Sequence, residues 1–252
     1  MNNPEFFDTP GKKQLTIVHL YPDLMNIYGD RGNIIALKQR ALWRNIDVKI
    51  IPISLGDNLE TGIADIYFLG GGQDSSQNVV ANDLQRLKKI IKTDVENGTV
   101  ALTICGGYQL FGHYYKDQKG KKLKGISIFD AHTIAGKKRM IGNIKIKTNI
   151  IDPGSIILGF ENHSGQTFLG KNEKPFGRVL KGYGNNPRQH QEGIIYKNAI
   201  GTYLHGSLLP KNPGLTDWLI TKALQRKYSD FELSPLDDKL EEKTFKEATS
   251  RF

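Results

Sequence analysis

The sequence of 252 residues contains one cysteine, Cys105, and no long hydrophobic run. A single cysteine excludes an intrachain disulfide and any multi-cysteine zinc or iron–sulfur site. No apolar stretch approaches the roughly 20 residues that a membrane helix needs, and residues 1–13 lack the apolar segment of a signal peptide. We therefore expect a cytoplasmic protein with no integral membrane segment, in which the lone thiol is either inert or catalytic.

Phosphate-binding motifs are also missing. The sequence has no G-x-x-x-x-G-K-[ST] motif, and no G-x-G-x-x-G follows its first predicted strand. Binding of ATP or of a dinucleotide by this chain is therefore poorly supported. We predict neither a cofactor nor a bound metal.

Charge and composition are those of an ordinary globular protein. The chain has 35 Lys and Arg against 26 Asp and Glu, a net charge of +9, and 38% hydrophobic residues. This composition supports a sizeable core and excludes wholesale disorder. The lysines are spread over several segments rather than gathered on one predicted helix. That distribution favours a solvated surface over a nucleic-acid site.

The first half of the sequence alternates predicted strands and helices. Apolar, β-rich runs alternate with stretches in which apolar residues have helical spacing. The strands are expected at 15–20, 48–53, 63–69 and 99–104, and the helices at 32–44 and 82–96. Strands that are apolar almost throughout are typical of a parallel sheet with both faces covered. We predict an α/β fold with a mainly parallel central sheet flanked by helices.

Beyond residue 120 the pattern changes to short runs punctuated by glycine. These runs predict antiparallel strands and hairpins added to the core sheet. They lie at 126–129, 141–147, 156–160, 166–168, 178–180 and 193–196. A last core strand is expected at 199–203, followed by a helix at 216–227.

The sequence has no internal repeat and no low-complexity linker, which favours a single domain. We place this domain at residues 15–228, after an N-terminal tail of residues 1–14. Residues 229–252 form a charged C-terminal segment, predicted to be a peripheral helix or a frayed tail from residue 234 onward.

Cys105 lies between the predicted strand 99–104 and Gly106-Gly107, from which a helix over 108–115 can start. This is the sequence form of a nucleophile elbow, in which the nucleophile takes a strained backbone conformation and needs small neighbours. The N-terminus of the following helix stabilises a thiolate. The alternative is a small buried hydrophobic residue at a strand end. The flanking glycines favour catalysis.

A thiolate nucleophile needs a histidine partner that is near in space. Among six histidines, only His205 follows a predicted late core strand and precedes a glycine. It would emerge on the carboxyl edge of a parallel sheet beside Cys105, where such folds place their sites. The other five are interpreted as surface or satisfied core residues.

Gly70-Gly71-Gly72-Gln73-Asp74 follows the third predicted strand and should emerge on the same edge. Thiolate attack on an amide carbonyl creates an oxyanion, which backbone N–H groups of a glycine-rich turn can stabilise. Gly71 and Gly106 are the candidate oxyanion-hole donors.

Five segments together resemble a known family. GGGQD, ALTICGGYQLFG and GTYLHGSLLPKNP are similar to segments of class I, triad-type glutamine amidotransferase domains of the cobyric-acid-synthase-like branch. Within that branch, YPDLMNIYGDRGNIIALKQR and FENHSG resemble the glutaminase subunits of lipid II isoglutaminyl synthases. The similarity covers residues 15–228.

The resemblance implies hydrolysis of L-glutamine to glutamate and ammonia, with the ammonia passed to a separate Mur-ligase-like subunit of the MurT type. That ligase uses ATP to amidate the D-glutamate of the lipid II stem peptide, so this chain is expected in a heterodimer, near the inner face of the membrane. The resemblance makes Cys105 the nucleophile, His205 the general base and Arg139 the residue that binds glutamine. A guanidinium suits the carboxylate of a free amino acid. Without the resemblance, Arg139 is one more surface cation.

Two positions depart from the family pattern. Many class I amidotransferases have a glutamate two residues after the histidine, which orients it, whereas this sequence has Ser207. The site is then a Cys-His dyad, or it takes its orienting acid from elsewhere, with Glu161 and Asp30 as candidates. Thr103 stands where related enzymes often have glycine, which affects only the local turn geometry.

Two alternatives remain at this point. One is the amidase component of a cobyrinate- or cobyrate-type amidating enzyme, which normally carries an ATP-binding domain ahead of this one. Only fourteen residues precede the first predicted strand here. The other is a non-catalytic scaffold of the same fold, whose signature would be loss of the cysteine or the histidine, and both are present.

Overall fold

The computed structural model describes residues 12–27 and 29–250. Most of the expected N-terminal tail, residues 1–11, lies outside the described residues, as do Tyr28 and residues 251–252. In the described part, no helix is long and apolar enough to cross a membrane.

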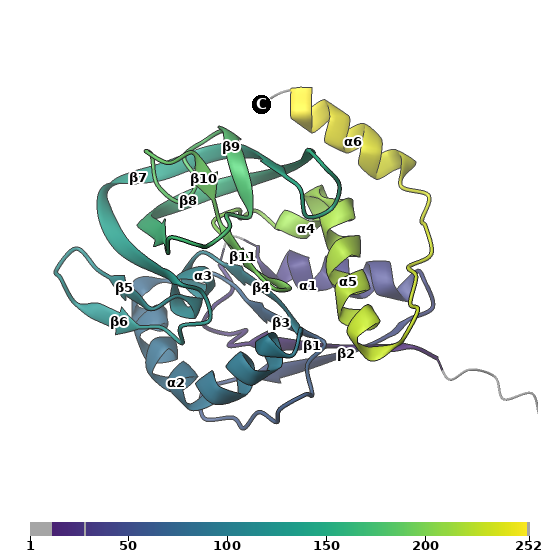
Figure 1. Ribbon diagram of the computed structural model, residues 1–252, viewed down its shortest axis with the longest axis horizontal. Helices are drawn as coiled ribbons and strands as arrows, with labels where there is room; N and C mark the ends of the chain where they lie inside the picture. Colours follow the sequence, from purple (N-terminus) through teal and green to yellow (C-terminus); the bar gives the residue numbers. More distant parts are fainter. Residues whose placement is uncertain (1–11, 28, 251–252) are drawn as a thin grey trace, which may run out of the picture.

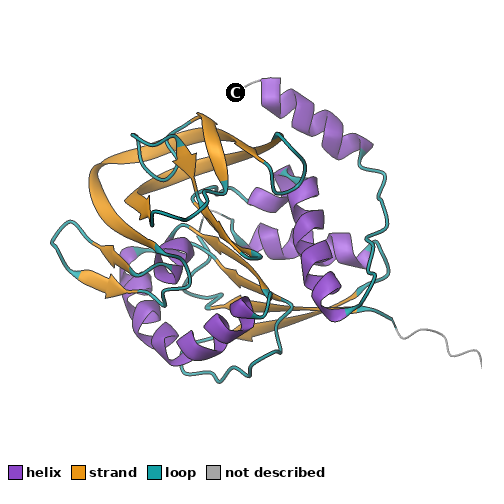
Figure 2. Ribbon diagram, viewed as in Figure 1, coloured by secondary structure: helices purple, strands orange, loops and turns teal. Residues whose placement is uncertain are grey.

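The core is a six-stranded sheet in which five strands run parallel (Figures 1 and 2). A sixth strand pairs antiparallel at one edge. In spatial order the strands are β11 (Ile194–Tyr196), β12 (Ala199–Thr202), β4 (Val100–Ile104), β3 (Ile66–Leu69), β1 (Gln14–Leu20) and β2 (Asp47–Ile53). The carboxyl ends of β3, β4 and β12 therefore meet at one edge, where loops carry the candidate site.

Helices cover both faces of this sheet (Figure 1). Alternate side chains of a strand point to opposite faces, so Val18 and Tyr67 pack against one helix layer while Ile17 and Phe68 pack against the other. The first layer contains α2 (Asp74–Glu96) and α3 (Gly106–Phe111); the second contains α1 (Arg31–Leu42), α4 (Leu208–Lys211) and α5 (Pro213–Lys227). The two-sided burial explains why the strands read as continuous apolar runs.

The antiparallel strands build a second sheet instead of extending the core, with only β11 joining the core sheet. The long strands β7 and β8 form its central ribbon. Its strands are β5 (Tyr114–Lys116), β6 (Lys122–Lys124), β7 (Ala131–Thr148), β8 (Ser155–Leu169), β9 (Gly177–Lys181) and β10 (Gln191–Glu192). The predicted α/β class with added antiparallel strands is confirmed. The prediction that these strands extend the core sheet is wrong, since most of them form a sheet of their own.

Three local predictions differ from the structure. The helix predicted over 108–115 ends at Phe111, because Gly112 is extended and the next N–H, that of His113, donates to the Ala131 carbonyl and not to the helix. The run 126–129 is a loop whose backbone N–H groups donate to carbonyls at the end of α3. The helix predicted at 82–96 begins at Asp74. Its first turns were not predicted because their residues are mostly polar and show no apolar periodicity.

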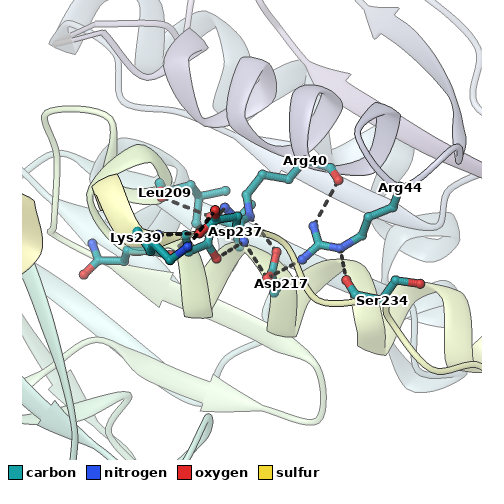
Figure 3. Close-up of polar contacts among 10 residues, drawn as sticks. Arg40, Arg44, Leu209, Asp217, Ser234, Asp237 and Lys239 are labelled. Carbon is teal, nitrogen blue, oxygen red and sulfur yellow. Dashed lines mark hydrogen bonds and ion pairs between the residues drawn. The ribbon is translucent and has the colours of Figure 1, made fainter. Parts of the chain in front are cut away.

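The C-terminal part is anchored to Arg40 of α1 and to Arg44, just beyond the end of that helix (Figure 3). Arg40 forms two hydrogen bonds to the Asp217 carboxylate, both 2.6 Å long, and it also pairs with Asp238. Arg44 donates to Asp217 and to the Ser234 carbonyl. These contacts fix the segment that leads into α6 (Lys239–Ser250), a helix with no buried residue at the periphery of the molecule. Of the two predicted forms, the helix is therefore the one observed.

Candidate active site

Cys105 occupies the turn between β4 and α3. Its backbone has φ 51° and ψ −103°, a region that residues with a side chain rarely adopt. Its N–H donates to the Thr202 carbonyl of the neighbouring strand at 2.8 Å. Gly107 must lack a side chain, because a Cβ there would lie 2.4 Å from the Leu69 carbonyl oxygen. The strand–turn–helix geometry expected of an elbow is present.

His205 lies beyond the end of β12, fully buried. Its backbone pairs with Phe160 of β8, and its side chain lies beside Gly71, where an added Cβ would be 3.0 Å from His205 Cε1. Burial alone would lower the pKa of His205, but the neighbouring Cys105 and Asp30 raise it to about 10. The direction of this shift favours the charged form of the ring beside Cys105, as a histidine that partners a cysteine nucleophile needs.

Asp30 supplies the carboxylate behind His205. Its Oδ1 lies 3.5 Å from His205 Nδ1, and both side chains are fully buried. Its Oδ2 accepts the Gly71 N–H at 2.7 Å, while the Gly71 carbonyl accepts the N–H of Ile27. The loop before α1 and the glycine loop after β3 therefore hold each other, and they fix the carboxylate against the imidazole.

Ser207, which replaces the expected glutamate, contacts the same loop. Its hydroxyl donates to the Gly29 carbonyl, and a Cβ at Gly32 would lie 2.2 Å from its oxygen. The next residue of α1, Asn33, accepts the Leu209 N–H through its side chain at 2.8 Å. The GDRGN segment therefore places Asp30 at the histidine and leaves room for Ser207.

Glu161, the other candidate for the orienting acid, lies elsewhere. Its two carboxylate oxygens accept the N–H groups of Tyr183 and Gly184, at 2.8 and 2.9 Å. Its nearest histidine is His163, with 3.7 Å between Oε2 and Nε2. Among the two candidates, Asp30 is the one beside His205.

A cavity of about 250 Å³ opens in front of the cysteine. Its wall combines the glycine loop, the start of α2 and the β7–β8 ribbon, and most of the residues are polar. The lining residues are Ile27, Gly72, Gln73, Asp74, Gln77, Cys105, Gln109, Tyr115, Arg139, Asn162, His163, Ser164 and Gly165. Such a volume and polarity suit a small, charged, hydrogen-bonding ligand.

Arg139 reaches this cavity from an irregularity in β7. The register of β7 against β8 shifts between Ala135 and Met140, and bulges of this kind often redirect side chains near sites. The guanidinium Nε donates to the Asn162 side chain of β8. Arg139 and Cys105 therefore line one cavity, as the resemblance requires.

The glycine loop presents its residues in different ways. The Gly71 N–H is engaged by Asp30, whereas Gly72 lines the cavity. A Cβ placed on Gly106 would lie 3.3 Å from the Gly72 nitrogen, so the two glycine backbones lie close together beside Cys105. Gly106 begins α3, where the N–H groups of the first turn have no partner within the helix.

Sequence reasoning missed His163 and the polar residues beneath the cavity. His163, interpreted as structural, lines the cavity although it is only 3% exposed. Gln77 donates to Gln109, and Gln109 donates to the Tyr203 hydroxyl. The signal available was the strand alternation of FENHSG, which puts Glu161 and His163 on one face of β8.

The structure has the fold of solved glutamine amidotransferases. A structure of PurLQS from Thermotoga maritima superposes with a TM-score of 0.60 at 15% identity, covering 86% of this chain and 100% of the other. A second structure, described as a glutamine amidotransferase, gives a TM-score of 0.54 at 10% identity, covering 82% and 98%. At these identities the likeness concerns the fold.

Sequence comparisons are more specific. The model of the CobB/CobQ-like glutamine amidotransferase domain matches residues 16–213. The GatD subunit of lipid II isoglutaminyl synthase (glutamine-hydrolyzing) from Staphylococcus aureus is 43% identical over 90% of this chain and 92% of its own length. The same subunit from Streptococcus pneumoniae is 42% identical over 93% and 90%.

A cobyric acid synthase from Listeria monocytogenes shares 31% identity, over 58% of this chain but only 29% of its own length. The similarity to the GatD subunits is thus both higher and nearly end to end. The chain belongs to the CobB/CobQ-like family of glutamine amidotransferases and, within it, to the group of the GatD subunits.

Proposed function

We propose that this chain is a glutaminase subunit that hydrolyses L-glutamine and supplies the ammonia to a MurT-type ligase, which amidates the D-glutamate of the lipid II stem peptide. The observation that carries the proposal is Cys105 in an elbow turn, beside a buried His205 and Asp30, at the floor of a polar cavity. A scaffold without activity would have no need of the strained backbone at Cys105.

The residues suggest a two-stage reaction. The Cys105 thiolate attacks the side-chain carbonyl carbon of glutamine, and the oxyanion forms beside the N–H of Gly106. Of the two glycines named from the sequence, Gly71 holds Asp30 through its N–H, and Gly72 is better placed as the second donor. His205 gives its proton to the leaving nitrogen as the C–N bond breaks. Ammonia departs, and the acyl group remains bound to Cys105 as a thioester.

Water completes the cycle. His205, now neutral, removes a proton from a water molecule, and the resulting hydroxide attacks the thioester carbonyl. The C–S bond breaks, glutamate leaves, and the thiolate and imidazolium are restored. Asp30 orients His205 and stabilises the imidazolium in both stages.

Arg139 is proposed to bind the α-carboxylate of glutamine. Replacing it with alanine is expected to raise KM for glutamine about 10- to 100-fold while kcat changes little, because a contact to the carboxylate exists in the ground state as well as in the transition state. Steady-state kinetics measure both constants. Lys138→Ala, which removes a neighbouring cation of the same segment, serves as the control. A normal KM in the Arg139 variant would show that Arg139 is a surface cation that does not bind glutamine.

The partner is the part of the proposal that needs its own experiment. Ammonia equilibrates quickly with solvent, so a chain that makes it and has no phosphate-binding motif needs an adjoining acceptor site. Co-expression with a Mur-ligase-like protein should give one complex in size-exclusion chromatography, and calorimetry should show ATP bound by the ligase subunit alone. Separate elution at micromolar concentration, or ATP bound by this chain, would instead favour a self-contained amidating enzyme.

The net charge of +9 fits this setting. A basic chain is drawn towards an acidic ligase surface or towards the anionic membrane that holds lipid II, and either attraction is compatible with work near the inner face of that membrane. Steering of this kind changes the association rate more than the specificity.

A further inference from the structure

Glu161 and His163 form a second buried carboxylate–histidine pair, which the reaction above does not use. Both project from β8, the strand whose Phe160 pairs with the backbone of His205. Glu161 is fully buried and His163 is 3% exposed, yet His163 lines the cavity that contains Cys105. His163 therefore borders the cavity in front of Cys105, and Glu161 lies behind it, away from the cavity.

The position of His163 is fixed on two sides. Its Nδ1–H donates to the Gly165 carbonyl at 2.8 Å. Its ring stacks on Tyr203, with centroids 3.6 Å apart and planes 3° from parallel. The hydrogen bond determines the tautomer of the neutral ring, which leaves a lone pair on Nε2.

His163 is an acceptor in this setting. Burial lowers its pKa, although Glu161 and the Gly165 carbonyl act in the opposite direction. Among the described residues, Nε2 has no hydrogen-bond partner. A buried acceptor without a donor destabilises the fold, so a polar atom left in this state next to a cavity points to a ligand that satisfies it.

Glu161 makes the need for a donor stronger. Its oxygens already accept two backbone N–H groups, and its Oε2 faces His163 Nε2 at 3.7 Å, beyond hydrogen-bonding distance. Two acceptors thus face each other where β8 borders the cavity. A small molecule with at least two N–H groups would satisfy this arrangement, because it can donate to both acceptors at once.

We propose that His163 Nε2, supported by Glu161, accepts a hydrogen bond from the leaving nitrogen of the substrate amide and then holds the released ammonia. The inference rests on the proposed glutaminase activity. In the step concerned, the amide nitrogen keeps its two hydrogens, takes a third from His205, and carries away the electron pair of the broken C–N bond. One of its own N–H groups points to His163 throughout, so His163 gains and loses no proton.

This role makes His163 a determinant of specificity for amides. In a γ-methyl ester of glutamate, the leaving oxygen carries no hydrogen before His205 protonates it, so it has nothing to donate to His163. Attack by Cys105, the oxyanion and the deacylation step are the same for both substrates. The ratio of amide to ester turnover therefore isolates the contact to the leaving group.

The test compares kcat/KM for L-glutamine and for L-glutamate γ-methyl ester in His163→Phe, which keeps an aromatic ring on Tyr203 and removes the acceptor. We expect glutamine turnover to fall at least about fivefold, the effect of one lost hydrogen bond of ordinary strength, and ester turnover to stay within about twofold. His163→Gln, which retains an acceptor oxygen, should recover part of the ratio. If the Phe variant does not fold, His163→Leu carries the same expectation as Phe.

His132→Phe is the matched control. His132 lies on β7 of the same ribbon and stacks between Tyr114 and Phe168, but it does not line the cavity. The ratio of amide to ester turnover in the His132→Phe variant should therefore equal that of the wild type. Equal losses on both substrates in His163→Phe, or an unchanged glutamine turnover, would overturn the inference and leave the glutaminase proposal standing. A wild-type chain that hydrolyses neither substrate, alone or with its partner, would overturn both.

Discussion

Replacing Cys105 with serine is expected to abolish glutamine hydrolysis while the fold remains intact. The hydroxyl occupies nearly the same volume but is not ionised beside His205 at neutral pH, so the ion pair that attacks the amide is lost. By comparison with other nucleophile deletions, turnover should fall by about 10⁴-fold or more. Ammonia release in a coupled assay measures the rate, and thermal unfolding of the variant checks the fold.

The composition of the chain supplies a control. Cys105 is the only cysteine, so iodoacetamide can alkylate no other thiol. Alkylation of the wild type should remove activity in proportion to the label, and glutamine should slow it by filling the cavity. A serine variant that keeps more than a few per cent of wild-type activity would show that the thiol is not the nucleophile.

Much of the fold could be predicted because its signals are local. The buried strands β1, β3 and β4 are continuous apolar runs, and the glycines after Cys105 mark a tight strand-to-helix turn. The topology then brings the ends of β4 and β12 together, since they are neighbours in the sheet. This is why Cys105 and His205 could be named from chain order alone.

The rest of the site depends on contacts between segments far apart in the sequence. Asp30 and His205 are separated by 175 positions, and contacts of the Asp30 loop with Gly71 and with Ser207 bring them together. His163 is indistinguishable in sequence from a satisfied core histidine, and its exposure to the cavity follows from the register of β7 and β8. The second sheet was also missed, because short alternating runs do not specify which strand they pair with.

The structure gives a reason for the absence of a glutamate after His205. In many class I enzymes the orienting acid lies two residues after the histidine, and this chain has Ser207 there. Ser207 instead fixes the Gly29 carbonyl, one residue before Asp30. The N-terminal loop thus places a carboxylate beside His205, and Ser207 helps to hold that loop in place.

Asp30→Asn tests this exchange of roles. The asparagine can still accept the Gly71 N–H, so the loop should keep its shape, but the negative charge beside His205 is gone. We expect kcat to fall by about 100- to 10,000-fold, since an orienting acid of this kind holds the imidazole in the productive tautomer and stabilises its charged form.

The pH profile distinguishes this role from a structural one. Asp30 is one of the groups that raise the pKa of His205 to about 10, so its replacement lowers that pKa. His205 must be protonated to give its proton to the leaving nitrogen, and activity at alkaline pH is lost as the ring deprotonates. The alkaline limb of kcat/KM should therefore move to lower pH in Asp30→Asn. Asp23→Asn, the same change at an exposed position of the same loop, should leave both the rate and the profile unchanged. An Asp30 variant with wild-type turnover and an unshifted alkaline limb would reduce the site to a Cys105–His205 dyad.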